Sequence, residues 1–166
     1  MKMRLLYGVI GLWLCLSSSY AMAGQNIILM RHALAPGTGD PAHFTVDDCR
    51  TQRNLNEVGI AQAKEIGARL RAQGLVPTRI LSSVWCRCQD TAKYLGLGPY
   101  EVHEGLSSFY DGHVDRDETM ALLRAELATI GDDELVLFVT HQVVISALTG
   151  VFVKSGGYLI EDSTRF

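Results

Sequence analysis

The stretch 26–33, which reads N-I-I-L-M-R-H-A, decides the fold. Its apolar run over 27–30 is short and rich in branched residues, which favours a strand buried on both faces over a helix. The run stops abruptly at Arg31-His32. Because open α/β sheets bind their ligands at the carboxyl ends of buried strands, this cation and this imidazole are candidates for an anion site that contains a nucleophile.

Apolar strands and amphipathic helices alternate along the rest of the chain. Residues 34–48 contain Pro and Gly without periodicity, which predicts a loop. Further strands are expected over 79–82, 100–102 and 135–139. Helices are expected over 57–73, 85–95, 117–130 and 143–148, and an edge hairpin over 151–153 and 158–160. This order predicts an α/β fold, a three-layer α/β/α sandwich with a mainly parallel central sheet.

Residues 1–23 have the features of a secretory signal peptide. A basic start with Lys2 and Arg4 precedes an apolar core over 5–16 and an A-x-A cleavage site over 21–23. A membrane anchor is the alternative, but the apolar core is shorter than the ~20 residues that a spanning helix needs. We therefore expect cleavage, no stable membrane insertion, and a periplasmic or secreted product in which residues 24–166 form a single domain.

The charge balance of residues 24–166 argues against nucleic acid as a partner. Without Lys2 and Arg4, the 15 basic residues of the chain become 13 against 18 acidic ones, which gives a net charge of −5. Nucleic-acid binding depends on clustered Lys and Arg side chains that neutralise phosphates, and the chain has no basic run. Basic residues that converge on one spot would therefore indicate a local phosphate pocket.

Three cysteines, Cys49, Cys86 and Cys88, follow the expected cleavage site. In an oxidising compartment this odd number predicts one disulfide, from Cys49 to Cys86 or to Cys88, with the third thiol buried. Half of a metal site at Cys86-x-Cys88 is the alternative. Its spacing of one residue and the lack of a second cysteine pair argue against it, so no metal is expected.

Four residues in equivalent positions are expected to converge at one edge of the sheet. Arg31-His32 and His141 each follow a buried strand, and Arg87 lies in the first turn of the helix after the strand 79–82. Neighbouring parallel strands end at the same edge, and a helix N-terminus favours an anion through its free N–H groups and its dipole. Two arginines and two histidines in these positions predict a phosphate site.

These motifs resemble the histidine phosphatase superfamily, whose fold is like that of phosphoglycerate mutase. The family signature Arg-His-Gly stands here as R-H-A at 31–33. The second arginine of the family follows a Ser-Ser-Pro turn and precedes Thr-Ala, which is similar to S-S-V-W-C-R-C-Q-D-T-A at 82–92. Its second histidine ends a late apolar strand, as His141 does, and N-L-N-E-V-G at 54–59 looks like the start of its first helix. The resemblance covers most of residues 26–150.

The resemblance implies a chemical role for each residue of the site. Arg31 and Arg87 would hold the phosphoryl oxygens through charge-assisted hydrogen bonds, with Arg53 as a third cation. Neutral His32 would attack phosphorus and form a phosphohistidine, which water then hydrolyses. His141 would donate to the transferring group and stabilise its charge.

A carboxylic acid that protonates the leaving group is the least defined part of the expected site. The larger members of the family supply this acid from a segment between the two halves of the fold, where Glu104 is the nearest candidate and Asp111 lies behind it. Neither residue lies in a recognisable motif. Without an acid, good leaving groups would be favoured because they depart without a proton.

The expected function is that of an exported, metal-independent phosphatase. It would hydrolyse small phosphomonoesters through phosphorylated His32 and use no cofactor. Two alternatives from other classes stay open. One is a non-catalytic domain that recognises phosphate through Arg31, Arg87 and His141, and the other is an interaction domain without a small ligand. Phosphorylation of His32 during turnover distinguishes the first hypothesis from the other two.

Overall fold

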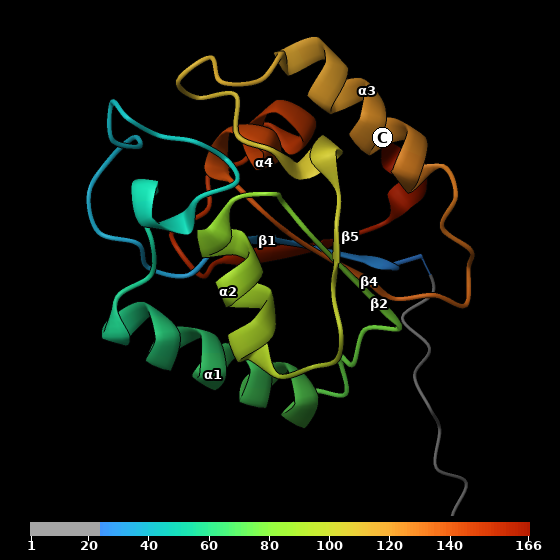
Figure 1. Ribbon diagram of the computed structural model, residues 1–166. Coiled ribbons are helices and arrows are strands. Elements are labelled where there is room, and N and C mark those ends of the chain that lie inside the picture. Colours follow the sequence, from blue (N-terminus) through green and yellow to red (C-terminus); the bar gives the residue numbers. More distant parts are fainter. Residues whose placement is uncertain (1–23) are drawn as a thin grey trace, which may run out of the picture.

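The computed structural model describes residues 24–166, and the expected signal peptide over 1–23 lies outside the described residues. A five-stranded sheet has the order β3-β2-β4-β1-β5, and its neighbours run parallel except β5, which pairs antiparallel with β1 at one edge (Figure 1). The strands are β1 (Ile27–Arg31), β2 (Arg79–Ser82), β3 (Glu101–Val102), β4 (Val136–Thr140) and β5 (Tyr158–Glu161). The α-helices are α1 (Glu57–Ala72), α2 (Cys86–Leu95), α3 (Arg116–Leu127) and α4 (Gln142–Thr149). Within residues 24–166, no helix has the length and apolar character needed to cross a membrane.

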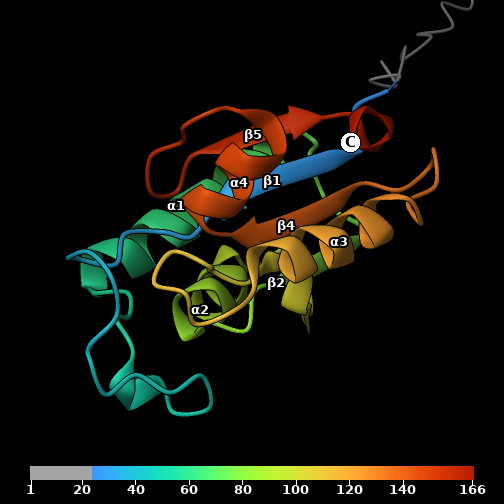
Figure 2. The same ribbon diagram turned by 90° about the horizontal axis from the view of Figure 1, so that it is seen from above.

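The central strands are buried on both faces, as their continuous apolar sequences predict. Helices α1 and α2 cover one face of the sheet, while α3 and α4 cover the other (Figure 2). Within β1, Ile28 and Met30 pack in the cluster of α1 and α2, and Ile27 and Leu29 pack in the cluster of α3. Each of these fully buried side chains stabilises the fold by roughly 1.5–3 kcal/mol relative to an exposed one. The expected three-layer sandwich with a mainly parallel sheet is therefore confirmed.

The expected edge hairpin is wrong in its first strand. Residues 151–153 form no strand, because side chains of the site form hydrogen bonds with their backbone. The side-chain oxygen of Gln142 accepts a hydrogen bond from the N–H of Val153 at 2.9 Å, and Arg31 donates to the carbonyl oxygen of Val153 at 3.2 Å. Only β5 forms, and its partner is β1. The remaining expected elements are present, with bounds that differ by a few residues.

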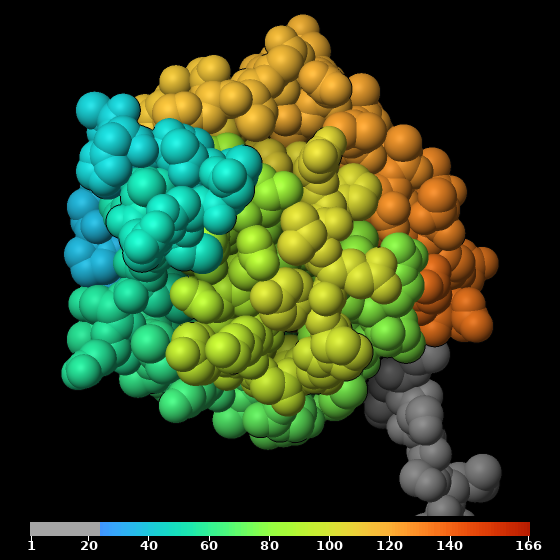
Figure 3. Space-filling view, in the orientation of Figure 1, coloured from blue at the N-terminus to red at the C-terminus, as the bar shows by residue number. Residues whose placement is uncertain are grey.

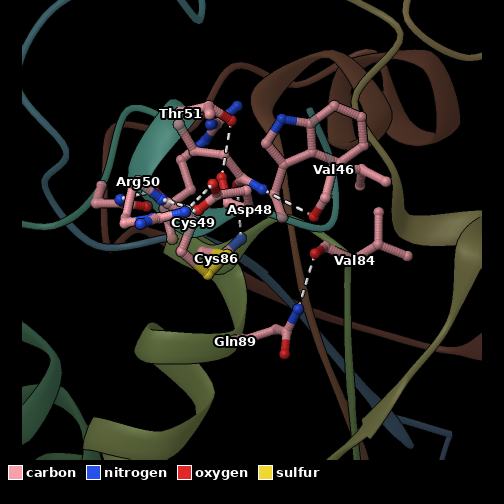
Figure 4. The surroundings of a disulfide bond; sticks show 12 residues. Val46, Asp48, Cys49, Arg50, Thr51, Val84, Cys86 and Gln89 are labelled. Atoms are coloured by element: carbon pink, nitrogen blue, oxygen red, sulfur yellow. Dashed lines mark hydrogen bonds and ion pairs between the residues drawn. A yellow bond between two sulfur atoms is a disulfide. The ribbon is translucent and has the colours of Figure 1, made fainter. Parts of the chain in front are cut away.

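A disulfide fixes the long loop between β1 and α1 to the start of α2. Cys49, in the short 3-10 helix η1 (Cys49–Thr51), is bonded to Cys86 (Figure 4). Cys88 is a buried free thiol. The side-chain oxygen of Gln52 accepts a hydrogen bond from the N–H of Cys86 at 2.9 Å. Trp85, at the N-cap, makes no such side-chain bond, so Gln52 caps the helix instead. The expectation of one bridge from Cys49 with the third thiol buried is confirmed.

The same loop contacts the segment that follows the 3-10 helix η2 (Glu104–Leu106). The ring of Phe44 stacks on Trp85 with 5.4 Å between ring centres and lies 4.4 Å from the ring of His113. Figure 3 shows the cyan surface of the loop against the yellow to orange surface of the later segment. Aromatic contacts thus join the loop between β1 and α1 to the segment that follows η2.

Reduction of the disulfide is expected to lower the free energy of unfolding by about 3–4 kcal/mol. Cys49 and Cys86 are separated by 37 residues, and a bridge that closes a loop of this length restricts the unfolded chain by about this amount. Urea unfolding with and without dithiothreitol measures the effect. Cys88→Ala is the control, because this variant keeps the bridge and its response to reductant. An unchanged unfolding midpoint after complete reduction would show that the bridge contributes nothing.

Candidate active site

The carboxyl ends of β1 and β4 bring the two predicted histidines together. The strands lie side by side in the sheet, and Arg31 pairs with Thr140 at their ends. His32 and His141 follow these positions directly, and their ring centres are 5.5 Å apart. Arg87, in the first turn of α2, lines the same cavity. The four residues predicted to converge therefore do so.

His32 is fixed as a neutral imidazole with one ring nitrogen free. Its side chain is buried, and its Nδ1 lies 2.7 Å from the carbonyl oxygen of Ala33, to which it donates. Burial, and then the positive charge of Arg87, lower the pKa of His32 to about 3. Nε2 therefore carries an unprotonated lone pair, which attack on phosphorus requires.

Arg87 is held in a buried ion pair with Asp40. Its Nη1 and Nη2 lie 2.8 and 3.1 Å from the two carboxylate oxygens of Asp40, and both side chains are 3% exposed. The indole of Trp85 and the backbone N–H of Arg53 also donate to this carboxylate. Burial opposes ionisation of Asp40, but these donors outweigh it and hold the pKa of Asp40 below its ordinary value. Asp40 therefore orients Arg87 as a charged partner.

The ion pair leaves one edge of the Arg87 guanidinium free. Its Nε is buried without a hydrogen-bond partner within residues 24–166, and the same is true of Nε in Arg31. Burial, and then the charge of Arg87, also lower the pKa of Arg31. A buried N–H without an acceptor is costly. Two such donors on residues that line the cavity of His32 indicate an anionic ligand.

Arg53, the expected third cation, lines the same cavity. Its Nε donates to the carbonyl oxygen of Gly39 at 2.8 Å, and its Nη1 donates to the carbonyl oxygen of Ala35. Burial, and then the charge of Arg87, lower the pKa of Arg53. Three arginines thus line the cavity, and Asp40 neutralises one of them, so the site is cationic although the domain is acidic.

His141 makes its side-chain hydrogen bonds through Nε2. Its Nε2 lies 2.9 Å from Oγ of Ser83 and 3.4 Å from Sγ of Cys88. Oγ of Ser83 also accepts a hydrogen bond from the backbone N–H of Trp85, and we assign its own proton to Nε2 of His141. Burial, and then the charge of Arg87, keep the pKa of His141 well below its ordinary value. With this assignment, the neutral ring carries its proton on Nδ1 and donates from there without a positive charge.

Ser83→Ala is expected to lower kcat about tenfold with little change in KM. The hydroxyl selects the His141 tautomer that donates to the transferring group, and loss of one such hydrogen bond corresponds to about this factor. Steady-state kinetics with a phosphomonoester measure the effect. Ser82→Ala is the matched control, because the hydroxyl of this buried neighbour donates only to the carbonyl oxygen of Ser83. Equal losses in both variants would contradict the assigned role.

The structure does not bring Glu104 to the site. The cavity that contains His32 has a volume of about 210 Å3, and Glu104 lines a separate cavity beside Trp85 and Phe44. Glu104 follows β3, an edge strand that β2 and β4 separate from β1. The expectation that Glu104 protonates the leaving group is therefore corrected. Asp111 is the carboxylate that lines the cavity of His32.

Sequence reasoning missed Asp40 and Ser83 as parts of the site. Asp40 lies in the loop 34–48, where no periodic pattern distinguishes it from the neighbouring acids Asp47 and Asp48. Ser83 lies within the motif around the second arginine, so its place at the end of a strand beside His141 was a usable signal. Within residues 24–166, no three His, Cys, Asp or Glu side chains are grouped as metal ligands.

The model of the histidine phosphatase superfamily (branch 1) matches residues 27–120, more than half of the chain. The chain belongs to the histidine phosphatase superfamily. Its signature residues Arg31 and His32, its second arginine Arg87 and the later His141 all lie at one cavity, as the resemblance implies. No curated protein matches the chain. Membership of this superfamily supports a phosphatase function.

Solved structures of several phosphatases share the fold. One is a provisionally named phosphohistidine phosphatase SixA from Nakamurella multipartitia, with 27% identity and a TM-score of 0.53 over 73% of this chain and 61% of that chain. This chain therefore spans less than two thirds of that relative. The protein histidine phosphatase SixA in complex with tungstate has 18% identity and a TM-score of 0.51 over 84% and 97% of the two chains. A mycobacterial glucosyl-3-phosphoglycerate phosphatase with VO3 has 18% identity and a TM-score of 0.59 over 81% of this chain and 90% of that chain.

Stability is expected to fall as the pH is lowered from about 7 to 5. The unfolded chain binds protons on its histidines below about pH 6.5, whereas His32 in the folded protein binds one only near pH 3. Because the unfolded state then binds more protons, the free energy of unfolding decreases on acidification, by at most about 1.4 kcal/mol per pH unit for each such histidine. Urea unfolding across this range measures the slope.

His32→Gln is expected to flatten the pH dependence of unfolding, because it removes one group that is buried in the neutral form. His43→Gln is the control, since His43 is exposed and outside the cavity. A slope that His32→Gln leaves unchanged would contradict burial of a neutral imidazole at this position.

Proposed function

We propose that this histidine phosphatase superfamily member hydrolyses small phosphomonoesters through a covalent phosphohistidine on His32. The observation that supports this most directly is the free Nε2 of a neutral His32 in a cavity lined by Arg31 and Arg87, each of which has a buried Nε–H group without a hydrogen-bond partner within residues 24–166. A phosphomonoester is an anion that repels nucleophiles. Arginines that neutralise its oxygens allow a neutral imidazole to approach.

The proposed reaction has two displacements at phosphorus. Nε2 of His32 forms a bond to phosphorus while the bond from phosphorus to the ester oxygen breaks, and the leaving group departs with that electron pair. Nδ1 donates to the carbonyl oxygen of Ala33 throughout, so the positive charge of the phosphorylated ring is partly compensated. Water then attacks phosphorus, the bond from nitrogen to phosphorus breaks, and orthophosphate leaves.

The surrounding groups stabilise the charge of the transferring phosphoryl group. Arg31 and Arg87 supply fixed positive charge, and Asp40 holds Arg87 in place before the substrate arrives. His141 donates from Nδ1 to an equatorial oxygen. Preorganised donors of this kind commonly supply the largest part of catalysis in phosphoryl transfer. Asp111 carries the one carboxyl group among the residues that line the cavity.

Export is part of the proposal and is supported by the signal-like features of residues 1–23 and by the disulfide. Disulfides persist mainly in oxidising compartments such as the periplasm. The substrate would then be a phosphorylated small molecule outside the cytoplasm. Signal cleavage after residue 23, detected by N-terminal sequencing of the secreted or periplasmic product, tests this part.

Hydrolysis of p-nitrophenyl phosphate in the presence of EDTA tests the proposed function. The expected result is turnover that EDTA leaves unchanged and that orthophosphate and vanadate inhibit. Absence of turnover with several phosphomonoesters would overturn the proposal. If orthophosphate still raised the melting temperature in that case, the alternative of a non-catalytic phosphate-recognising domain would replace it, because a ligand that binds only the folded state stabilises it.

A further inference from the structure

Two exposed aromatic side chains lie at the cavity of His32. Tyr110 and Phe152 are 59% and 72% exposed, whereas every other Phe, Trp and Tyr among residues 24–166 is buried or half-buried. Both line this cavity, although one follows η2 and the other follows α4. Exposed aromatic surface that is confined to one cavity indicates a ligand-contact surface.

Phe152 lies directly beside a residue of the phosphate site. The guanidinium carbon of Arg31 is 5.9 Å from the centre of the Phe152 ring, and Nη1 of Arg31 donates to the carbonyl oxygen of Val153. The position of Phe152 is therefore coupled to that of the cation that holds the phosphoryl group. A phosphate bound at Arg31 would therefore lie close to this ring.

The size and the chemistry of the cavity restrict the leaving group. Its volume of about 210 Å3 is below the ~300–1,000 Å3 of sites that enclose drug-sized ligands. Its one lining carboxyl group is on Asp111, an exposed residue, so no buried acid stands among the lining residues to protonate a leaving alkoxide. A phenolate departs more readily than an alkoxide, because a phenol, with a pKa of about 10, is a stronger acid than an alcohol.

We infer that the preferred substrates are aryl phosphomonoesters in which a single aromatic ring is attached to the phosphate oxygen. The ring contacts Phe152 and Tyr110 while Arg31 and Arg87 hold the phosphoryl group. When the bond from phosphorus to the ester oxygen breaks, the phenolate takes the electron pair and then a proton from solvent. This inference rests on the phosphatase function proposed above and adds the class of leaving group.

The test compares p-nitrophenyl phosphate with acetyl phosphate. Both have good leaving groups, but only the first carries a ring, so the pair separates ring contact from leaving-group departure. In Phe152→Ala/Tyr110→Ala, KM for p-nitrophenyl phosphate is expected to rise about tenfold, the size expected for lost aromatic contacts. The change for acetyl phosphate is expected to stay below about twofold. Phe152→Tyr is expected to retain the low KM, whereas Phe152→Leu is not.

Val102→Ala is the matched control, because Val102 is an exposed apolar residue in β3 and outside the cavity. It is expected to change neither KM. Equal changes for both substrates in the double variant, or no change for either, would overturn the ring contact and leave the phosphatase function standing. Failure of the unaltered protein to hydrolyse either substrate would overturn the proposed function, and this inference with it.

Discussion

His32→Ala is expected to lower kcat for p-nitrophenyl phosphate by at least about 10⁴-fold, because removal of a covalent nucleophile leaves only binding and electrostatic stabilisation. No other residue can replace it. His141 is the other imidazole in the cavity, but its Nε2 lies against Ser83 and its Nδ1 carries the proton in the tautomer assigned above. Neither nitrogen of His141 presents a lone pair to phosphorus.

Two controls separate loss of the nucleophile from loss of structure in His32→Ala. Orthophosphate is expected to raise the melting temperature of the variant, because the three arginines of the cavity remain. His43→Ala, which removes an exposed histidine of the neighbouring loop, is expected to keep full activity. Residual activity of more than a few per cent in His32→Ala would show that a different group attacks phosphorus.

Asp40→Ala is expected to lower the free energy of unfolding by about 3–5 kcal/mol. Its carboxylate is the charged partner of Arg87, both side chains are almost fully buried, and removal of one partner leaves a buried charge uncompensated. Trp85 and the backbone of Arg53 also lose their acceptor. Urea unfolding measures the loss. The same variant is expected to lose kcat/KM, because Arg87 is no longer held in its orientation.

Asp40→Asn distinguishes charge from shape. Asparagine fills nearly the same space but leaves Arg87 without a counter-charge, so it is expected to destabilise the protein nearly as much as alanine does. Asp48→Asn is the matched control, since the pair of Asp48 with Arg50 lies on the surface of the same loop and is expected to contribute little. If Asp40→Asn were as stable as the unaltered protein, the buried pair would have no electrostatic role.

The parts of the fold that follow from local pattern were predictable from the sequence. β1 and β4 are buried on both faces, so their side chains form continuous apolar runs, and the rule that ligands bind at the carboxyl ends of strands places His32 and His141 correctly. Arg87 was equally predictable, because it lies in the first turn of the helix that follows β2. Such positions depend on neighbours in sequence and on the order of the strands.

The parts that depend on irregular segments were not predictable. Asp40 pairs with a residue 47 positions away, and no periodic pattern specifies that contact. Glu104 was a candidate by sequence position alone, but β3 lies at the sheet edge on the far side of β2, and the carboxylate faces another cavity. The absence of the expected strand over 151–153 has a similar cause. The side chains of Arg31 and Gln142 form hydrogen bonds with the backbone of Val153. In each case tertiary contacts override the local signal.

The most direct test of a covalent phosphohistidine is a rapid-quench experiment. The protein is mixed with excess p-nitrophenyl phosphate labelled at phosphorus, stopped in alkali within the first turnover, and digested for peptide mass spectrometry. A phosphohistidine intermediate predicts label on His32 that is stable in base, is released by acid, and is absent from His32→Ala. Label on any other residue, or a complete first turnover without labelled protein, would contradict it.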